Sequence, residues 1–238
     1  MKKTILLISA GLVFLSASVS AAETVVMSAI EGSTDAEAAV AVIGEAYKNI
    51  GYEIDIKWYP GSTALEKSSS GEVDAELQRI DGISQKYPDL IQIPIPINFL
   101  QASVFVTDVT FTLDGWYSLK PYRIGIVKGV LFAEQGTQGM DVRAAGSYSE
   151  LLEMLEKKIV DVAVMPRVNG LAAIKQQKIE GIRELNGVLE ILFLYHYVHK
   201  KNSILIPKLQ KVLKEMLLNG TTRRLWNETY AEIIGGEY

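Results

Sequence analysis

The 238-residue sequence contains no cysteine. This absence excludes disulfides, thiolate metal sites, a catalytic thiol and a lipid-modified cysteine at an N-terminal cleavage point. Histidine is scarce as well, since only His196 and His199 occur, and a Ser-His-Asp triad would have to use one of them. Residues three apart on a strand point to opposite faces, so we predict no metal site at this pair. We also predict that the protein has no cofactor.

Basic tracts and phosphate-binding loops are also missing. The chain has 24 Lys and Arg against 28 Asp and Glu, a formal net charge of −4. No Gly-Lys-Ser/Thr loop is present, and no Gly-x-Gly-x-x-Gly follows a predicted strand. Nucleic-acid affinity depends on Lys and Arg neutralising phosphates, so we predict no nucleic-acid partner.

The first 22 residues have the pattern of a secretory signal peptide. Lys2 and Lys3 form a positive start, and the apolar run from Ile5 to Leu15 is too short to span a bilayer of about 30 Å. Small residues follow as far as Ala22. We predict cleavage after Ala21 or Ala22 and a mature protein that is exported and soluble.

Hydrophobic periodicity predicts alternating strands and helices from residue 23 onward, an α/β fold with parallel strands joined by crossovers. Capping-box patterns stand at Thr34–Glu37, Thr63–Glu66 and Ser147–Glu150. Segment 91–97 contains Pro94 and Pro96, which places it at a sheet edge or in an extended loop. The predicted strands are 23–30, 52–59, 73–77, 101–110, 122–127, 141–145, 160–165 and 188–198. The predicted helices are 34–49, one after each of the other two capping boxes, 169–178, 207–220 and 222–234.

These elements divide into two α/β lobes. We predict that one lobe comprises residues 23–105 and 195–238, and that the other, residues 106–194, is inserted into it. The chain then crosses between the lobes twice, which makes a two-strand hinge.

One pattern occurs twice: a helix ends, a short apolar strand follows, and an arginine stands at the end of the strand. The two arginines are Arg79 and Arg167. Ligands of open α/β sheets bind outside the carboxyl ends of the strands, so both arginines are candidates for a cleft between the lobes, or else solvated strand-exit charges. Glu31 and Glu134 also lie near helix N-termini, where negative charge is favourable in any case. Trp58 either stacks on a ligand or packs in the core. The candidate ligand contacts are Glu31, Trp58, Glu76 and Arg79 in the first lobe, Gly129, Leu131, Glu134 and Arg167 in the second, and Tyr195 near the hinge.

Four segments in order carry a resemblance to a known family: GEVDAELQRIDG with YPDLIQIPIPI, YRIGIVKGVLFAEQ, SYSELLEMLEKKIVDVAVM and LQKVLKEMLLNGTTRRLWNE. They resemble the bacterial periplasmic solute-binding proteins of the amino-acid type, with the type II periplasmic-binding-protein fold. The resemblance implies a monomer in the periplasm that closes on a small polar solute, possibly an amino acid or another small carboxylate. It implies delivery to an inner-membrane ABC permease or a membrane sensor, and no enzymatic activity.

The sequence departs from that family where a ligand would be recognised. The family's Thr-Pro-x-Arg segment is replaced by Ile83–Pro88, which contains no arginine. The family's Asp for the ligand ammonium is not evident either. We hypothesise that Arg79 binds a ligand carboxylate instead, since its planar guanidinium suits that group. Two other functions stay open: an adaptor for a membrane signalling protein, and a lyase or dehydratase with Glu31, Glu76 or Glu134 as acid or base.

Overall fold

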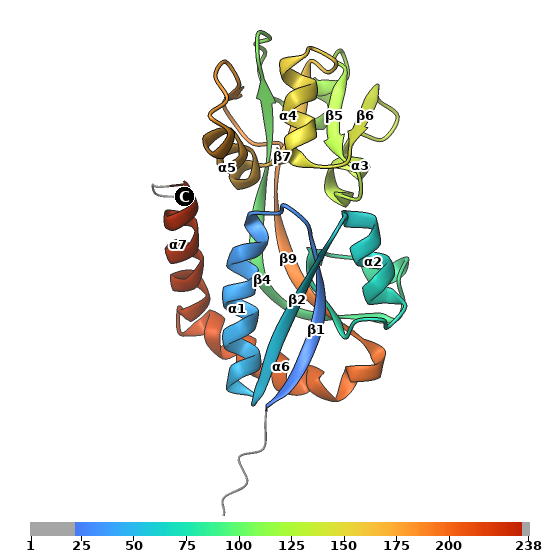
Figure 1. The fold of residues 1–238 in the computed structure, drawn as a ribbon, viewed down its shortest axis with the longest axis vertical. Coiled ribbons are helices and arrows are strands. Elements are labelled where there is room, and N and C mark those ends of the chain that lie inside the picture. Colours follow the sequence, from blue (N-terminus) through green and yellow to red (C-terminus); the bar gives the residue numbers. More distant parts are fainter. Residues whose placement is uncertain (1–21, 235–238) are drawn as a thin grey trace, which may run out of the picture.

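The computed structural model describes residues 22–234 and has two α/β lobes arranged along its longest axis (Figure 1). The predicted fold class is confirmed. The predicted signal peptide falls almost entirely on residues 1–21, which lie outside the described residues. Among residues 22–234, no helix combines the length and the apolar character that crossing a membrane requires.

The first lobe is a sheet flanked by helices, at the lower end of Figure 1. Strands β1 and β2 are parallel, β1 is parallel to β3, and β3 is antiparallel to β9. Its elements are β1 (Glu23–Ile30), α1 (Asp35–Asn49), β2 (Tyr52–Tyr59), α2 (Gly61–Ser69), β3 (Ala75–Ile80), the 3-10 helices η1 (Ile83–Gln85) and η3 (Lys200–Leu205), α6 (Ile206–Leu218) and α7 (Thr221–Ile234).

The second lobe contains a smaller sheet in which β5 lies between β6 and β7, parallel to both. Its core gathers apolar side chains from these strands and from α4, among them Leu151, Leu155 and Val162. Its elements are the 3-10 helix η2 (Trp116–Leu119), β5 (Ile124–Val127), α3 (Leu131–Gly136), β6 (Val142–Ala145), α4 (Tyr148–Glu156), β7 (Val162–Pro166), α5 (Arg167–Gln177) and β8 (Arg183–Glu184).

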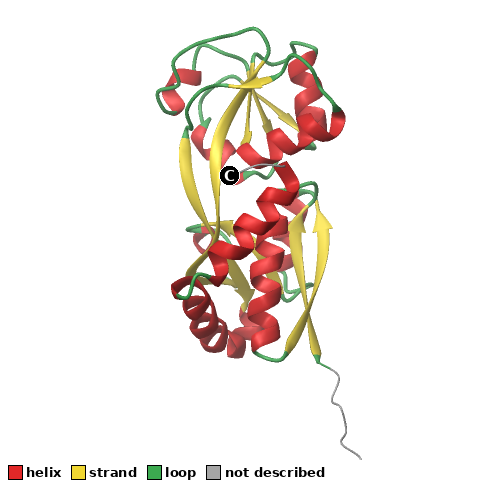
Figure 2. Cartoon of the chain, turned by 90° about the vertical axis from the view of Figure 1, so that its left-hand side faces the viewer, coloured by secondary structure: helices red, strands yellow, loops and turns green. Residues whose placement is uncertain are grey.

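Two long antiparallel strands connect the lobes, β4 (Leu90–Val106) and β9 (Glu190–His199). Figure 2 shows them running side by side from one lobe to the other. They pair from Leu90 and His199 to Ala102 and Glu190, after which β4 pairs with β7 and β8. The two crossings form the hinge region, and the residue boundaries predicted for the lobes stay a prediction.

Helix α1 shows how periodicity positions the first lobe. Its buried face repeats at the helical spacing of three and four residues and packs against the sheet. That buried face is Asp35, Ala36, Ala38, Ala39, Val42, Ile43, Ala46 and Tyr47. A carboxyl group therefore lies on an otherwise apolar helix face, at the end of α1 nearest the second lobe.

Several element predictions need correction. Segment 91–97 and residues 101–106 form one strand, β4, because its pairing with β9 continues through the prolines with shifts in register. Residues 107–110 of the predicted strand lie outside it. Residues 91–97 have β9 on one side only, so the predicted edge position is right. The strand predicted at 73–77 is β3, displaced to 75–80. The capping box at Thr63 is wrong because α2 already begins at Gly61. Thr34 makes no side-chain capping bond, whereas Ser147 accepts a hydrogen bond from Glu150 N as predicted.

The two histidines lie in different surroundings. His196 is buried, with its Nδ1 3.1 Å from the carbonyl oxygen of Leu77 and its Nε2 3.0 Å from the Tyr47 hydroxyl. A carbonyl can only accept, so Nδ1 carries the proton and Nε2 accepts from Tyr47. His199 instead caps η3 by accepting from Lys201 N. No group of three or more metal-ligating side chains occurs among residues 22–234.

Candidate ligand-binding cleft

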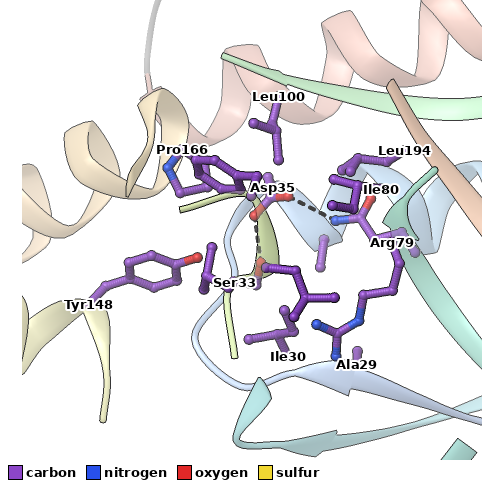
Figure 3. Close-up of a pocket in the computed structure, with 15 residues that line it drawn as sticks. Ala29, Ile30, Ser33, Asp35, Arg79, Ile80, Leu100, Tyr148, Pro166 and Leu194 are labelled. Atoms are coloured by element: carbon purple, nitrogen blue, oxygen red, sulfur yellow. Dashed lines mark hydrogen bonds between the residues drawn. The ribbon is translucent and has the colours of Figure 1, made fainter. Parts of the chain in front are cut away.

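A cavity of about 40 Å³ lies between the lobes, near the hinge (Figure 3). Its lining comes from both lobes and from both crossing strands. The polar members are Ser33, Asp35, Gln78, Arg79 and Tyr148. The remaining members are apolar: Ala29, Ile30, Ala36, Ile80, Leu100, Val130, Leu131, Phe132, Pro166 and Leu194.

Asp35, in the first turn of α1, is the acidic group of this cavity. Ser33 Oγ donates to its Oδ1 at 2.5 Å and Gln78 Nε2 donates to its Oδ2 at 2.8 Å, as the dashed lines of Figure 3 show. Burial raises the pKa of the Asp35 carboxyl, and these hydrogen bonds oppose part of that rise. The group is 3% exposed, so its protonation depends on what shares the cavity with it.

A buried amide network holds Gln78 in place. Asn98 Nδ2 donates to Gln78 Oε1 at 2.9 Å and to the Asp35 carbonyl at 2.8 Å, while Tyr230 OH donates to Asn98 Oδ1 at 2.8 Å. Because Asn98 occupies the Gln78 oxygen, the Gln78 nitrogen must face Asp35. Asn98 of β4 and Tyr230 of α7 thus fix the orientation of the Gln78 amide that faces Asp35.

Arg79 is the basic group of the cavity, and three of its five N–H donors are engaged within the chain. Its Nε donates to Glu76 Oε1 at 2.6 Å, its Nη2 to the Gly61 carbonyl at 2.9 Å and its Nη1 to the Gly129 carbonyl at 3.2 Å. Gly61 belongs to the first lobe and Gly129 to the second, so this guanidinium joins the lobes. In Figure 3 it lies beside Ala29 and is turned away from Asp35.

The backbones of the two lobes touch at the same place. Gly129 has a φ of +81°, and a Cβ built on it would lie 2.5 Å from Ser62 N. Only glycine fits both this conformation and this approach. On the other side of the cavity, Asp35 N donates to Asn169 Oδ1 at 2.9 Å, a second hydrogen bond between the lobes. The two lobes are therefore in a closed arrangement.

Tyr148 brings a hydroxyl from the first turn of α4. The side chain is buried, and Figure 3 shows its hydroxyl directed toward Ser33 and Asp35. Burial and the neighbouring Asp35 raise the pKa of Tyr148, so the phenol stays protonated and can donate.

The nine predicted contact residues are distributed unevenly. Arg79 and Leu131 line the cavity. Glu76 and Gly129 lie directly behind as partners of Arg79. Glu134 accepts from Gly129 N at 2.7 Å and, with Leu131, borders a wider outer cleft of about 550 Å³.

The other four do not border the inner cavity. Arg167 pairs with Glu184 at 3.1 Å, and Tyr195 borders a separate open pocket that shares Ile80 with the cavity. Glu31 is exposed at the end of β1, and Trp58 is 42% exposed at the end of β2. Whether any of the nine contacts a ligand stays a prediction.

Sequence reasoning missed Ser33, Asp35, Gln78, Phe132 and Tyr148. Asp35 and Tyr148 each lie inside a capping-box pattern, which explains a helix start and so gave no reason to look further. The signal for Asp35 was available, because it continues the buried spacing of Ala38, Ala39 and Val42.

Comparison with known proteins supports the fold. No family model matches the sequence. An uncharacterized protein of Shewanella oneidensis is 27% identical over 192 residues, which is 75% of this chain and 70% of that protein.

Among solved structures, an ancestral arginine-binding protein bound to glutamine has a TM-score of 0.72 and 18% identity, covering 91% of this chain and 100% of that chain. The GluR0 ligand-binding core with L-glutamate has a TM-score of 0.75 and 13% identity, covering 89% and 99%. A histidine kinase sensor domain similar to periplasmic binding proteins has a TM-score of 0.73 and 15% identity, covering 90% and 97%. This chain therefore has the type II periplasmic-binding-protein fold.

Proposed function

We propose that the protein is a periplasmic solute-binding protein that closes its two lobes on a small molecule and presents the closed form to a membrane partner. The observation that carries this proposal is the cavity lined by both lobes at the hinge, with one acidic and one basic side chain inside it. A ligand there contacts both lobes only when they are closed, so it stabilises that state by the difference in contact energy.

The partner is proposed to be an inner-membrane ABC permease. A membrane sensor is the second candidate, because a histidine kinase sensor domain is among the similar structures. Genes for a permease and an ATPase beside this gene would support transport. A neighbouring gene for a membrane histidine kinase or a cyclic-dinucleotide enzyme would support sensing instead.

We propose binding without turnover. Two of the acid-base candidates of an enzyme are engaged within the chain, Glu76 by Arg79 and Glu134 by Gly129 N, and the third, Glu31, is exposed. Turnover of any compound in a substrate screen would contradict this part of the proposal.

The test is a thermal-shift screen of the chain from Glu23 onward against amino acids, amines, small carboxylates and sugars. A ligand at one hundred times its dissociation constant adds about 2.7 kcal/mol to the stability of the folded state, which raises the melting temperature measurably. Small-angle scattering with and without each hit then measures closure. A panel in which no compound raises the melting temperature contradicts the proposal.

A further inference from the structure

The inner cavity holds two charged side chains, and their charges are balanced differently. Arg79 is 4% exposed, forms a 2.6 Å ion pair with Glu76 and donates to two carbonyl groups. Glu76 is in turn fixed by the hydroxyl groups of Ser28 and Ser68, at 2.7 and 2.8 Å. The guanidinium charge is therefore neutralised by the chain itself. A ligand carboxylate entering this cavity would lose its hydration and find no uncompensated cation.

Asp35 has the opposite situation. Its two carboxyl oxygens accept from Ser33 and Gln78, which are neutral groups. Among the described residues, no Lys, Arg or His forms an ion pair with it or contributes to its titration. Each oxygen has a further lone pair. A buried carboxylate with neutral donors alone is unfavourable, and a positive group placed beside it removes the penalty.

A second observation points to the same position. Asn169 is 1% exposed, and its Nδ2 has no hydrogen-bond partner in the described part of the chain. The amide cannot be turned over, because its Oδ1 already accepts from Asp35 N. The Asn169 side chain faces the Asp35 carboxyl and the Tyr148 hydroxyl, since its interaction lowers the pKa of both groups. Polar capacity thus remains unused where Asp35, Tyr148 and Asn169 meet.

The rest of the lining is apolar, from Ile30 and Ile80 in the first lobe to Phe132 and Pro166 in the second. We infer that this cleft binds a small primary amine as its ammonium ion, with the cationic head at Asp35, a compact apolar body against these side chains, and no carboxylate. The inference rests on the proposed function and names its ligand class.

The experiment compares amines with their parent amino acids, which differ by a single carboxylate. The cavity of about 40 Å³ calls for the smallest amines. The pairs are methylamine with glycine, ethylamine with alanine, and propylamine with 2-aminobutyrate, and ethanol serves as the neutral match of ethylamine. Thermal shift and calorimetry on the chain from Glu23 onward give the affinities. We expect at least one amine to bind roughly a hundredfold more tightly than its amino acid, because the acid must bury an unpaired carboxylate.

The variant Asp35→Asn keeps the size of the side chain and removes its charge. We expect it to lower amine affinity to that of the alcohol. Unchanged amine affinity in Asp35→Asn overturns the inference. If the variant does not fold, the wild-type protein decides, since an amine that binds no more tightly than the alcohol also overturns it.

The screen separates this inference from the proposed function. Binding of amino acids, carboxylates or sugars without binding of amines refutes the amine and leaves the solute-binding role intact. A panel in which nothing binds contradicts both.

Discussion

The substitution Glu76→Gln tests whether the ion pair behind the cavity holds the first lobe together. Glu76 is fully buried and Arg79 is 4% exposed, and the Nε–Oε1 distance is 2.6 Å. Glutamine has nearly the shape of glutamate and keeps hydrogen-bonding capacity toward the serine hydroxyls. It removes the negative charge and leaves the guanidinium buried with carbonyl groups as its remaining partners.

The expected cost follows from that one-sided change. Removing one partner of a buried ion pair typically destabilises a protein by about 3–5 kcal/mol, because the remaining charge is uncompensated. For a chain of this size each kcal/mol lowers the melting temperature by about 2–4 °C, so we expect a loss of roughly 6–20 °C. Differential scanning calorimetry measures it.

The matched control is Glu72→Gln. Glu72 pairs with Lys67, also at 2.6 Å, but their side chains are 58% and 32% exposed. Water screens such a pair, so we expect no measurable change in melting temperature. If Glu76→Gln and Glu72→Gln have the same melting temperature, the buried charge of Arg79 does not depend on Glu76 for its neutralisation. The argument that the chain itself neutralises this guanidinium would then fail.

Two further predictions concern the lobe contact and the buried histidine. Gly129→Ala places a Cβ 2.5 Å from Ser62 N, so scattering should show a more open ligand-free protein, whereas Gly139→Ala, with a similar φ of +78° and nothing within 4 Å, should not open it. Burial lowers the pKa of His196 from 6.5 to about 4, so the unfolded chain binds the proton first as the pH falls. The contribution of neutral His196 to the free energy of unfolding is therefore fully present above about pH 6.5. It decreases by about 3 kcal/mol as the pH falls to about 4. Denaturant titrations along the pH range should show this loss in the wild type and not in His196→Gln.

Patterns with a fixed period could be predicted from the sequence. The helical spacing of α1 and the prolines on the one-sided segment of β4 gave correct positions because each follows from local geometry. The length of β4 could not be predicted, since the strand continues only because β9 pairs with it. A helix was expected near Glu134, but the bounds of α3 could not be predicted, because a six-residue run contains less than two turns of periodicity.

The pairing of Glu76 with Arg79 shows a different limit. Residues three apart on a regular strand point to opposite faces, which is how His196 and His199 come to lie in separate surroundings. Between Glu76 and Arg79 the register of β3 against β9 shifts, and both side chains reach the same side. A bulge depends on the partner strand, so no reading of β3 alone could show that its arginine is already paired.

The contacts that close the lobes are made by the residues that line the cavity, and this limits how a ligand can enter. Arg79 joins Gly61 to Gly129, and Asp35 joins α1 to Asn169. Each such hydrogen bond contributes about 1 kcal/mol net, so the two together contribute about 2 kcal/mol, roughly a factor of thirty, to the closed form. The ligand enters when these bonds are open, so the rarity of the open form slows association. The same bonds then reduce what the ligand must supply to keep the lobes closed, since a ligand shifts the equilibrium only by its difference in affinity for the two states. The proposed amine, with its single charged head, therefore has less to supply, because two hydrogen bonds between the lobes are already made by the protein.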